Sequence, residues 1–200
     1  MKTVTGLFDD YSDASAAVSA LESAGVPSKD ISIVANNADN RHADTSNATE
    51  GAGTGAGIGA AVGGAGGLLT GLGLMAIPGV GPVVAAGWLA ATAVGAVAGA
   101  VAGGATGGII GAMTRSGVSE DDAHVYAEGV RRGGSLVTAK VDDTLVPEAE
   151  AILQRSNWVD PAERRASYNE HGWTRFDDTL DPYKANEVEE ERSRYRSAAR

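Results

Sequence analysis

The chain has 200 residues, a formal net charge of −10 and no cysteine. The missing cysteine excludes disulfides, thiolate catalysis and cysteine metal sites, and the acidic balance argues against nucleic acid or anionic lipid headgroups as electrostatic partners. Met1 leads into a short strand-like run without the apolar segment of a signal peptide, so we expect the soluble parts to be cytoplasmic.

Residues 1–38 are predicted to form the first half of an α+β domain. Thr3 to Phe8 is a strand-like run, and an alanine-rich helical pattern follows it and ends at Gly25. Glycine is a common residue just past a helix C-terminus. Ile31 to Val34 is the second predicted strand, and the polar, aperiodic residues 39–50 are predicted to be a linker.

The central segment, residues 51–114, has no formally charged side chain. Four-residue spacing places residues on one slowly drifting stripe of a helix, where missing side chains allow a second backbone to approach closely. The pattern therefore predicts a glycine zipper in two helical arms, about 55–76 and 82–113. The turn between the arms is assigned to Pro78, Gly79, Gly81 and Pro82. The glycines that share the four-residue spacing are Gly51, Gly55, Gly59, Gly63, Gly67, Gly71, Gly87, Gly95, Gly99, Gly103, Gly107 and Gly111.

Two environments are open for this predicted helical hairpin. Each arm has at least the ~20 residues that a helix needs to cross ~30 Å of hydrocarbon. Long charge-free apolar runs favour insertion in a membrane, or a position lying on it, with the rest of the chain on the cytoplasmic side. The alternative is a cytoplasmic homo-oligomer in which several hairpins bury one another in a shared dry core.

Residues 115–158 are predicted to form the second half of the α+β domain. Ser119 and Asp122 have the spacing of a helix capping box, and the helix ends at Gly133. Leu136 to Val141 is a predicted strand, and 147–156 is a final helix. With the first half, this predicts a small ferredoxin-like βαβ/αβα sandwich with helices over one face of its sheet, split by the glycine-zipper hairpin.

The tail, residues 159–200, carries charges of alternating sign and is predicted to be mostly disordered. Its spaced aromatic residues offer an alternative, because they are suited to docking on the domain or on a partner. These aromatic residues are Tyr168, Trp173, Phe176, Tyr183 and Tyr195.

The sequence shows no arrangement typical of catalysis. His42, His124 and His171 are far apart, and the paired aspartates are adjacent rather than separated as an acid and a base require. Neither a P-loop nor a dinucleotide-binding glycine motif is present. We therefore expect no enzyme activity, no cofactor, no metal and no small-molecule substrate.

The chain resembles the YflT-type heat-induced or general stress protein domain of bacteria over about residues 3–142. The resemblance rests on residues 4–34, on the 76–82 turn, and on Val118–Val130 leading into Leu136. It implies a stress-associated protein without a known catalytic activity or an assigned ligand, and it carries no functional residues. The resulting prediction is a non-enzymatic, membrane-associated general stress protein; the alternative is a soluble oligomeric interaction module.

Overall fold

A computed structural model of the chain describes residues 1–40, 73–92 and 108–198. These residues form a five-stranded antiparallel sheet with the strand order β1-β5-β2-β4-β3. β1 and β3 are the two edge strands of this sheet. The strands are β1 (Lys2–Phe8), β2 (Ile31–Asn36), β3 (Gly73–Ile77), β4 (Gly81–Gly87) and β5 (Ser135–Val141).

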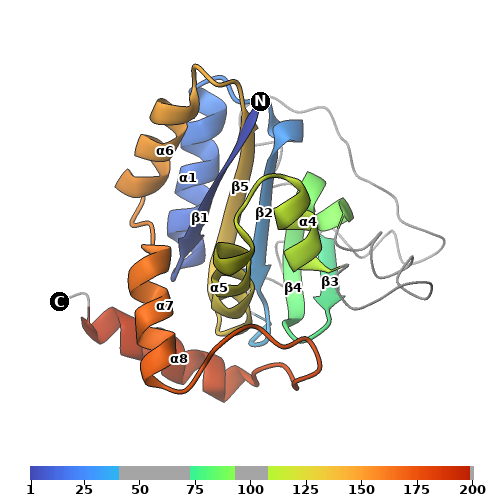
Figure 1. Ribbon diagram of the computed structural model, residues 1–200, viewed down its shortest axis with the longest axis vertical. Coiled ribbons are helices and arrows are strands. Elements are labelled where there is room, and N and C mark those ends of the chain that lie inside the picture. The colour runs from blue at the N-terminus through green and yellow to red at the C-terminus, as the bar shows by residue number, and fades with distance from the viewer. Residues whose placement is uncertain (41–72, 93–107, 199–200) are drawn as a thin grey trace.

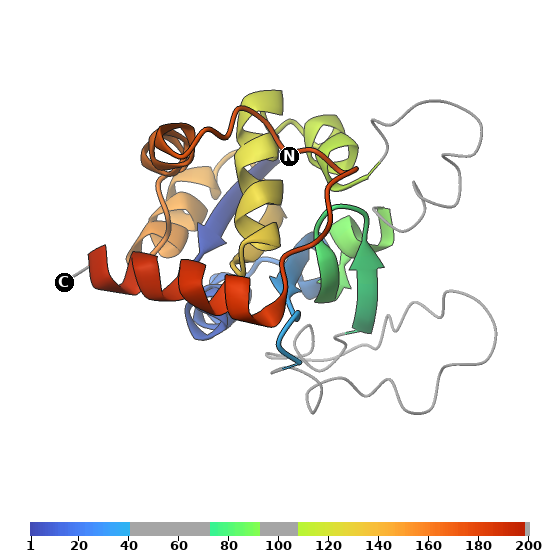
Figure 2. The same cartoon turned by 90° about the horizontal axis from the view of Figure 1, so that it is seen from below.

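Helices cover both faces of the sheet (Figures 1 and 2). One face packs against α1 (Tyr11–Ser23) and α6 (Val146–Arg155), and the other packs against α4 (Ile109–Arg115) and α5 (Glu120–Arg131). Successive strand residues point to opposite faces, so Leu7 and Phe8 belong to different cores. The α+β class is confirmed, but the predicted ferredoxin-like sandwich with helices over one face is wrong.

The strand, helix, cap and turn signals predicted for the two halves of the domain are confirmed. The β1-α1-β2 run lies within residues 1–38, with the 3-10 turn η1 (Ser28–Asp30) before β2. Ser119 caps α5 by accepting a hydrogen bond from the Asp122 N–H over 3.1 Å, and Gly133 beyond the helix has φ of 108°. These elements follow from capping and turn chemistry, which operates within a few residues.

The predicted helical hairpin is wrong at its centre, where the chain forms a β-hairpin. β3 and β4 pair from Ile77↔Gly81 to Gly73↔Ala85. A four-residue spacing is also a multiple of two, so it places residues on one face of a strand as well as on one stripe of a helix. Interior glycines lower helix propensity, and valines at the start of β4 favour strand.

Part of the central segment therefore belongs to the main sheet. β4 pairs with β2 over five residues, and α4 packs against α5 with Ile109 and Met113 buried. The prediction of a hairpin separate from the two domain halves is wrong for residues 73–92 and 108–114. Residues 51–72 and 93–107 lie outside the described residues. Within the described parts, no helix has both the length and the apolar character needed to cross a membrane.

The predicted disorder of the tail is also wrong for its described residues, 159–198. α7 (Pro161–Glu170) begins at Asp160, whose side chain accepts from the N–H groups of Ala162 and Glu163. A bend then leads to α8 (Ala185–Ala198), which lies across one end of the sheet (Figure 2). Buried side chains anchor both helices, and some of the charged residues of the tail, such as Arg164 and Arg192, have partners on the domain. The fully buried anchors are Tyr168 and Val188.

Candidate functional site

The structure describes only two of the twelve predicted zipper glycines, and it does not bring them together as a stripe. Gly87 ends β4 with φ of 90°, and a Cβ there would lie 2.2 Å from the carbonyl oxygen of Ile31. Gly111 lies on α4 and is buried. The other ten predicted zipper glycines lie outside the described residues. Gly87 therefore serves strand packing, because β2 passes too close for any side chain.

The predicted turn exists, but it joins strands and contacts the tail. Pro78 is exposed and Pro82 pairs with Ala76 inside the β-hairpin. Gly79 and Gly81 have φ of 72° and 97°. A Cβ on Gly79 would lie 2.6 Å from Asp178 Cα, and one on Gly81 would lie 2.7 Å from Pro182 Cβ. The two glycines thus let residues 178–182 cross the turn.

A cluster of buried charges holds α8 against the end of α5. We call Glu128, Arg131, Arg132, Glu191 and Arg192 the C-terminal clasp. Glu128 is fully buried and accepts from Arg132 Nε over 2.6 Å and from Arg131 Nη1 over 3.3 Å. Arg132 also pairs with Glu191 at 3.3 Å. Arg192 donates to the Gly133 carbonyl from Nε and Nη2, over 3.0 and 2.8 Å, and its Nη1 pairs with Asp39.

Aromatic rings complete the attachment of the tail. The guanidinium of Arg132 lies 4.3 Å from the ring centroid of Tyr168, that of Arg131 lies 4.7 Å from Tyr183, and that of Arg164 lies 3.7 Å from Tyr195. Such cation–π contacts are strengthened when the groups leave water. Tyr168, Phe176 and Tyr183 of the tail dock on the domain, as one of the two sequence hypotheses proposed.

Burial also changes the ionisation of these groups. Burial raises the pKa of the Tyr168 hydroxyl well above its ordinary value. Burial by itself disfavours the charged form of Arg164, but hydrogen bonding to Asp9 and the nearby Tyr168 more than offset it and raise the pKa of Arg164. Arg164 therefore stays charged and Tyr168 neutral across the physiological range.

His124 is the most buried histidine in the described segments, and its neighbours are an arginine and a glutamate. Its Nε2 lies 2.7 Å from Arg175 Nη2 and 3.8 Å from Glu120 Oε1. Burial, followed by the charge of Arg175, lowers the pKa of His124. His171 ends α7 on the exposed surface, and His42 lies outside the described residues. The described part of the chain contains no cluster of three metal-ligating side chains.

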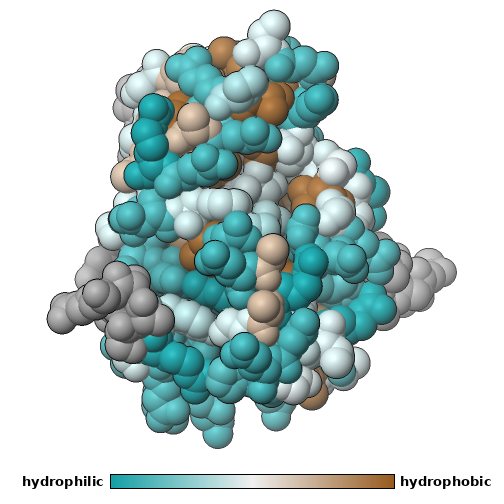
Figure 3. Space-filling view, turned by 60° about the vertical axis from the view of Figure 1, so that its left-hand side comes forward, coloured by the Kyte–Doolittle hydropathy of each residue, from teal (hydrophilic) through white to brown (hydrophobic). Residues whose placement is uncertain are grey.

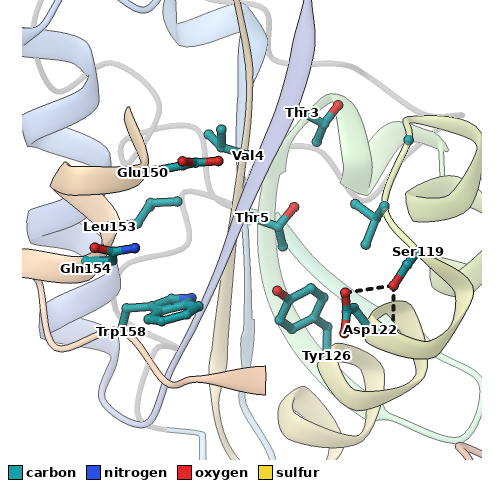
Figure 4. A pocket seen from close by; sticks show the side chains of 12 residues that line it. Thr3, Val4, Thr5, Ser119, Asp122, Tyr126, Glu150, Leu153, Gln154 and Trp158 are labelled. Atoms are coloured by element: carbon teal, nitrogen blue, oxygen red, sulfur yellow. Dashed lines mark hydrogen bonds between the residues drawn. The ribbon is translucent and has the colours of Figure 1, made fainter. Parts of the chain in front are cut away.

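A hollow lies along the edge strand β1, and we call it the β1 groove. It has a volume of about 410 Å³. Figure 4 shows α6 residues and Trp158 on one side of β1, and Tyr126, Ser119 and Asp122 on the other. The surrounding side of the molecule, which carries α6 and α7, is mainly hydrophilic with small separated apolar patches (Figure 3).

Sequence inspection did not identify either the clasp or the groove. The clasp joins residues 59 positions apart, as in Arg132 with Glu191. The groove depends on β1 being an edge strand, which follows from strand order rather than from any local motif. The spaced aromatic residues of the tail were the available sequence signal for its attachment, and the alternating charges favoured disorder instead.

Comparison with known proteins bears on the family of the chain. No match is found among curated proteins or among solved structures. Residues 3–77 match the family described as heat induced stress protein YflT domain. This segment contains α1, β2 and β3 and nearly all of β1, and it is the first part of the range over which the sequence resembles that family. Residues 3–77 of the chain are therefore similar to the YflT domain of heat-induced stress proteins.

Proposed function

We propose that this protein is a non-enzymatic general stress protein that acts by associating with other copies of itself. The family match supports the role in stress. The buried charged groups support a structural rather than a catalytic use, because Glu128 and Arg164 are engaged in pairs that hold the tail. This first candidate places the protein in the cytoplasm, with the edge strand β3 as its associating surface.

The observation that carries this proposal is the composition of the edge strand β3. In the described part of the sheet β3 pairs only with β4. It has no charged residue and no proline, and its Leu74 side chain is 48% exposed. Edge strands are usually protected from pairing with other chains by charges, prolines or bulges. The uncharged residues 51–72 precede β3 directly, so this edge favours association.

The test compares two leucines of equal exposure. Leu74→Lys places a charge at the β3 edge, and Leu180→Lys places one on the tail, where Leu180 is 49% exposed. Multi-angle light scattering across a concentration series should show an oligomer for the wild type and for Leu180→Lys, and a smaller species for Leu74→Lys. A wild type that stays monomeric at every concentration, or equal masses for all three proteins, would refute the proposal.

A second candidate is association with a membrane through the uncharged residues 51–72 and 93–107. Sequence composition supports it, because these residues contain no charged side chain and long apolar runs favour a lipid environment. It does not involve a helical hairpin turning at residues 78–82. Carbonate extraction followed by detergent extraction tests it: release by carbonate alone contradicts stable insertion, and release only by detergent supports it.

A further inference from the structure

The outer edge of β1 presents free backbone groups at alternate residues. Val159 N–H donates to the carbonyl oxygen of Leu7 over 2.8 Å, in an isolated antiparallel bridge. The Leu7 carbonyl therefore points away from β5. Residues in an antiparallel strand alternate between the two sides in their hydrogen bonding, so Thr5 and Thr3 also direct their N–H and C=O groups away from β5. Among the described residues, no backbone group donates to or accepts from the outward N–H and C=O groups of Thr3 and Thr5.

The walls of the β1 groove suit the two sets of side chains of an added strand. On one side Trp158 packs over Gly6, where a Cβ would lie 3.0 Å from Trp158 Cδ1, and Leu153 lies nearby. On the other side lies Tyr126, and Val118 also lines the groove. A buried polar atom beside the groove, Trp158 Nε1, has unused hydrogen-bonding capacity. An extended peptide alternates its side chains between two such walls.

The charges of the groove favour a basic peptide. Asp122 is already paired with Arg165 over 2.6 Å and accepts from the Ser119 hydroxyl over 2.7 Å. Glu150, on the opposite wall, is exposed and forms no ion pair with any described residue. A lysine or arginine in the peptide would complement Glu150, and the whole chain's net charge of −10 would also attract a basic segment.

We propose that the β1 groove binds an extended basic–apolar peptide segment of another protein, which adds to the sheet as a strand antiparallel to β1. The Leu7–Val159 bridge is already one antiparallel pairing on this edge, and the peptide would continue it past Thr5 and Thr3. Main-chain hydrogen bonds supply the affinity in this type of recognition. This proposal uses the opposite edge of the sheet from β3 and does not depend on self-association.

The test uses a fluorescein-labelled peptide, Ser-Val-Lys-Val-Lys-Val-Ser, with blocked ends, and fluorescence polarisation with the full chain. Thr5→Pro removes the outward N–H without removing a bond to β5, and edge strands tolerate proline at such positions. Thr5→Val is the matched control, because it keeps the N–H and removes the hydroxyl. We expect Thr5→Pro to weaken binding about tenfold through the lost hydrogen bond and the bulk of the ring, and Thr5→Val to bind as the wild type does.

Two modified peptides test the same hydrogen bonds without changing the protein. N-methylation at alternate residues blocks the amides on one side of the strand only. One of the two methylated peptides should lose binding to the wild type, and the other should keep it. Circular dichroism establishes that Thr5→Pro is folded; if it is not, the methylated peptides decide. The proposal is overturned by no binding to the wild type, by equal binding of both methylated peptides, or by unchanged binding to a folded Thr5→Pro.

Glu150→Gln tests the assigned peptide chemistry. It should weaken binding of the lysine peptide by about threefold at low salt, as expected for a partly exposed ion pair. It should not change binding of a peptide with serine in place of lysine. Equal effects on the two peptides would overturn the charge complementarity on which the choice of a basic partner rests.

Discussion

Arg164 of α7 forms a two-point ion pair with Asp9, in which Nη1 donates to Oδ1 and Nη2 to Oδ2, each over 2.8 Å. Asp9 follows β1 directly, so the pair fastens the tail to the start of the domain. Arg164 is 9% exposed. Planar two-point geometry and burial make such a pair much more specific than a surface ion pair.

Replacing Arg164 with Gln should lower the free energy of unfolding by about 2–4 kcal/mol, because Asp9 loses its partner in a partly buried site. Urea denaturation followed by fluorescence measures the change. Arg175→Gln is the control, since the Arg175–Glu120 pair is exposed on both sides, and its effect should stay below about 1 kcal/mol. Equal losses would show that the Asp9 pair has no special role.

The clasp predicts a separate effect on α8. Glu128→Gln removes the one negative charge between Arg131 and Arg132, which leaves two buried guanidinium groups without that counter-charge. We expect a loss of about 3 kcal/mol and faster proteolysis of residues 177–184, measured by intact mass after brief digestion. Glu163→Gln makes the same chemical change on the exposed face of α7 and should leave the digestion pattern as it is in the wild type.

The turn glycines allow backbone strain to be separated from contact with the tail. In Gly79→Ala the alanine must adopt a positive φ, and its Cβ would also clash with Asp178. Ala at Gly117 adopts a similar φ of 100° with no atom within 4 Å, and the conformational cost alone is about 1 kcal/mol. Thermal unfolding should therefore show at least twice the destabilisation for Gly79→Ala. Equal shifts in Tm for Gly79→Ala and Gly117→Ala would mean that the tail moves away from the new methyl group without loss of stability.

His124 predicts how stability changes in mild acid. Its pKa is lowered by burial and then by Arg175, against the raising effect of Glu120 and Asp121. Between that lowered pKa and about 6.5 the unfolded chain binds a proton that the folded chain does not. Stability should therefore fall as the pH is lowered through this window. Denaturation at several pH values should show a smaller slope for His124→Gln than for the wild type, and an unchanged slope would contradict the assignment.

The sequence was sufficient for elements whose signals are local. The cap at Ser119, the turn at 78–81 and the β1-α1-β2 order are present in the structure because each depends on neighbours a few residues away. The family resemblance was also available from the sequence, and the match to residues 3–77 confirms it. The order of strand and helix patterns in the two halves correctly indicated an α+β chain.

The sequence was ambiguous where two periodicities coincide. Glycine at every fourth residue suits a helix stripe and a strand face equally well. The strand outcome at 73–77 and 81–87 depends on β2, which offers a free edge to β4. No residue within the segment encodes that neighbour.

Only the tertiary structure decided where the tail and the groove lie. Alternating charges in residues 159–198 are compatible with solvent or with partners, and the choice depends on Asp9, Glu128 and the ring contacts supplied by distant elements. The β1 groove exists because β1 is an edge strand. β5 pairs with one side of β1, and no strand of the described sheet pairs with its other side. Strand order is the arrangement of lowest free energy among many possible pairings of distant strands, so only the tertiary structure shows it. Caps and turns depend on residues a few positions apart, so the sequence alone was enough to predict them.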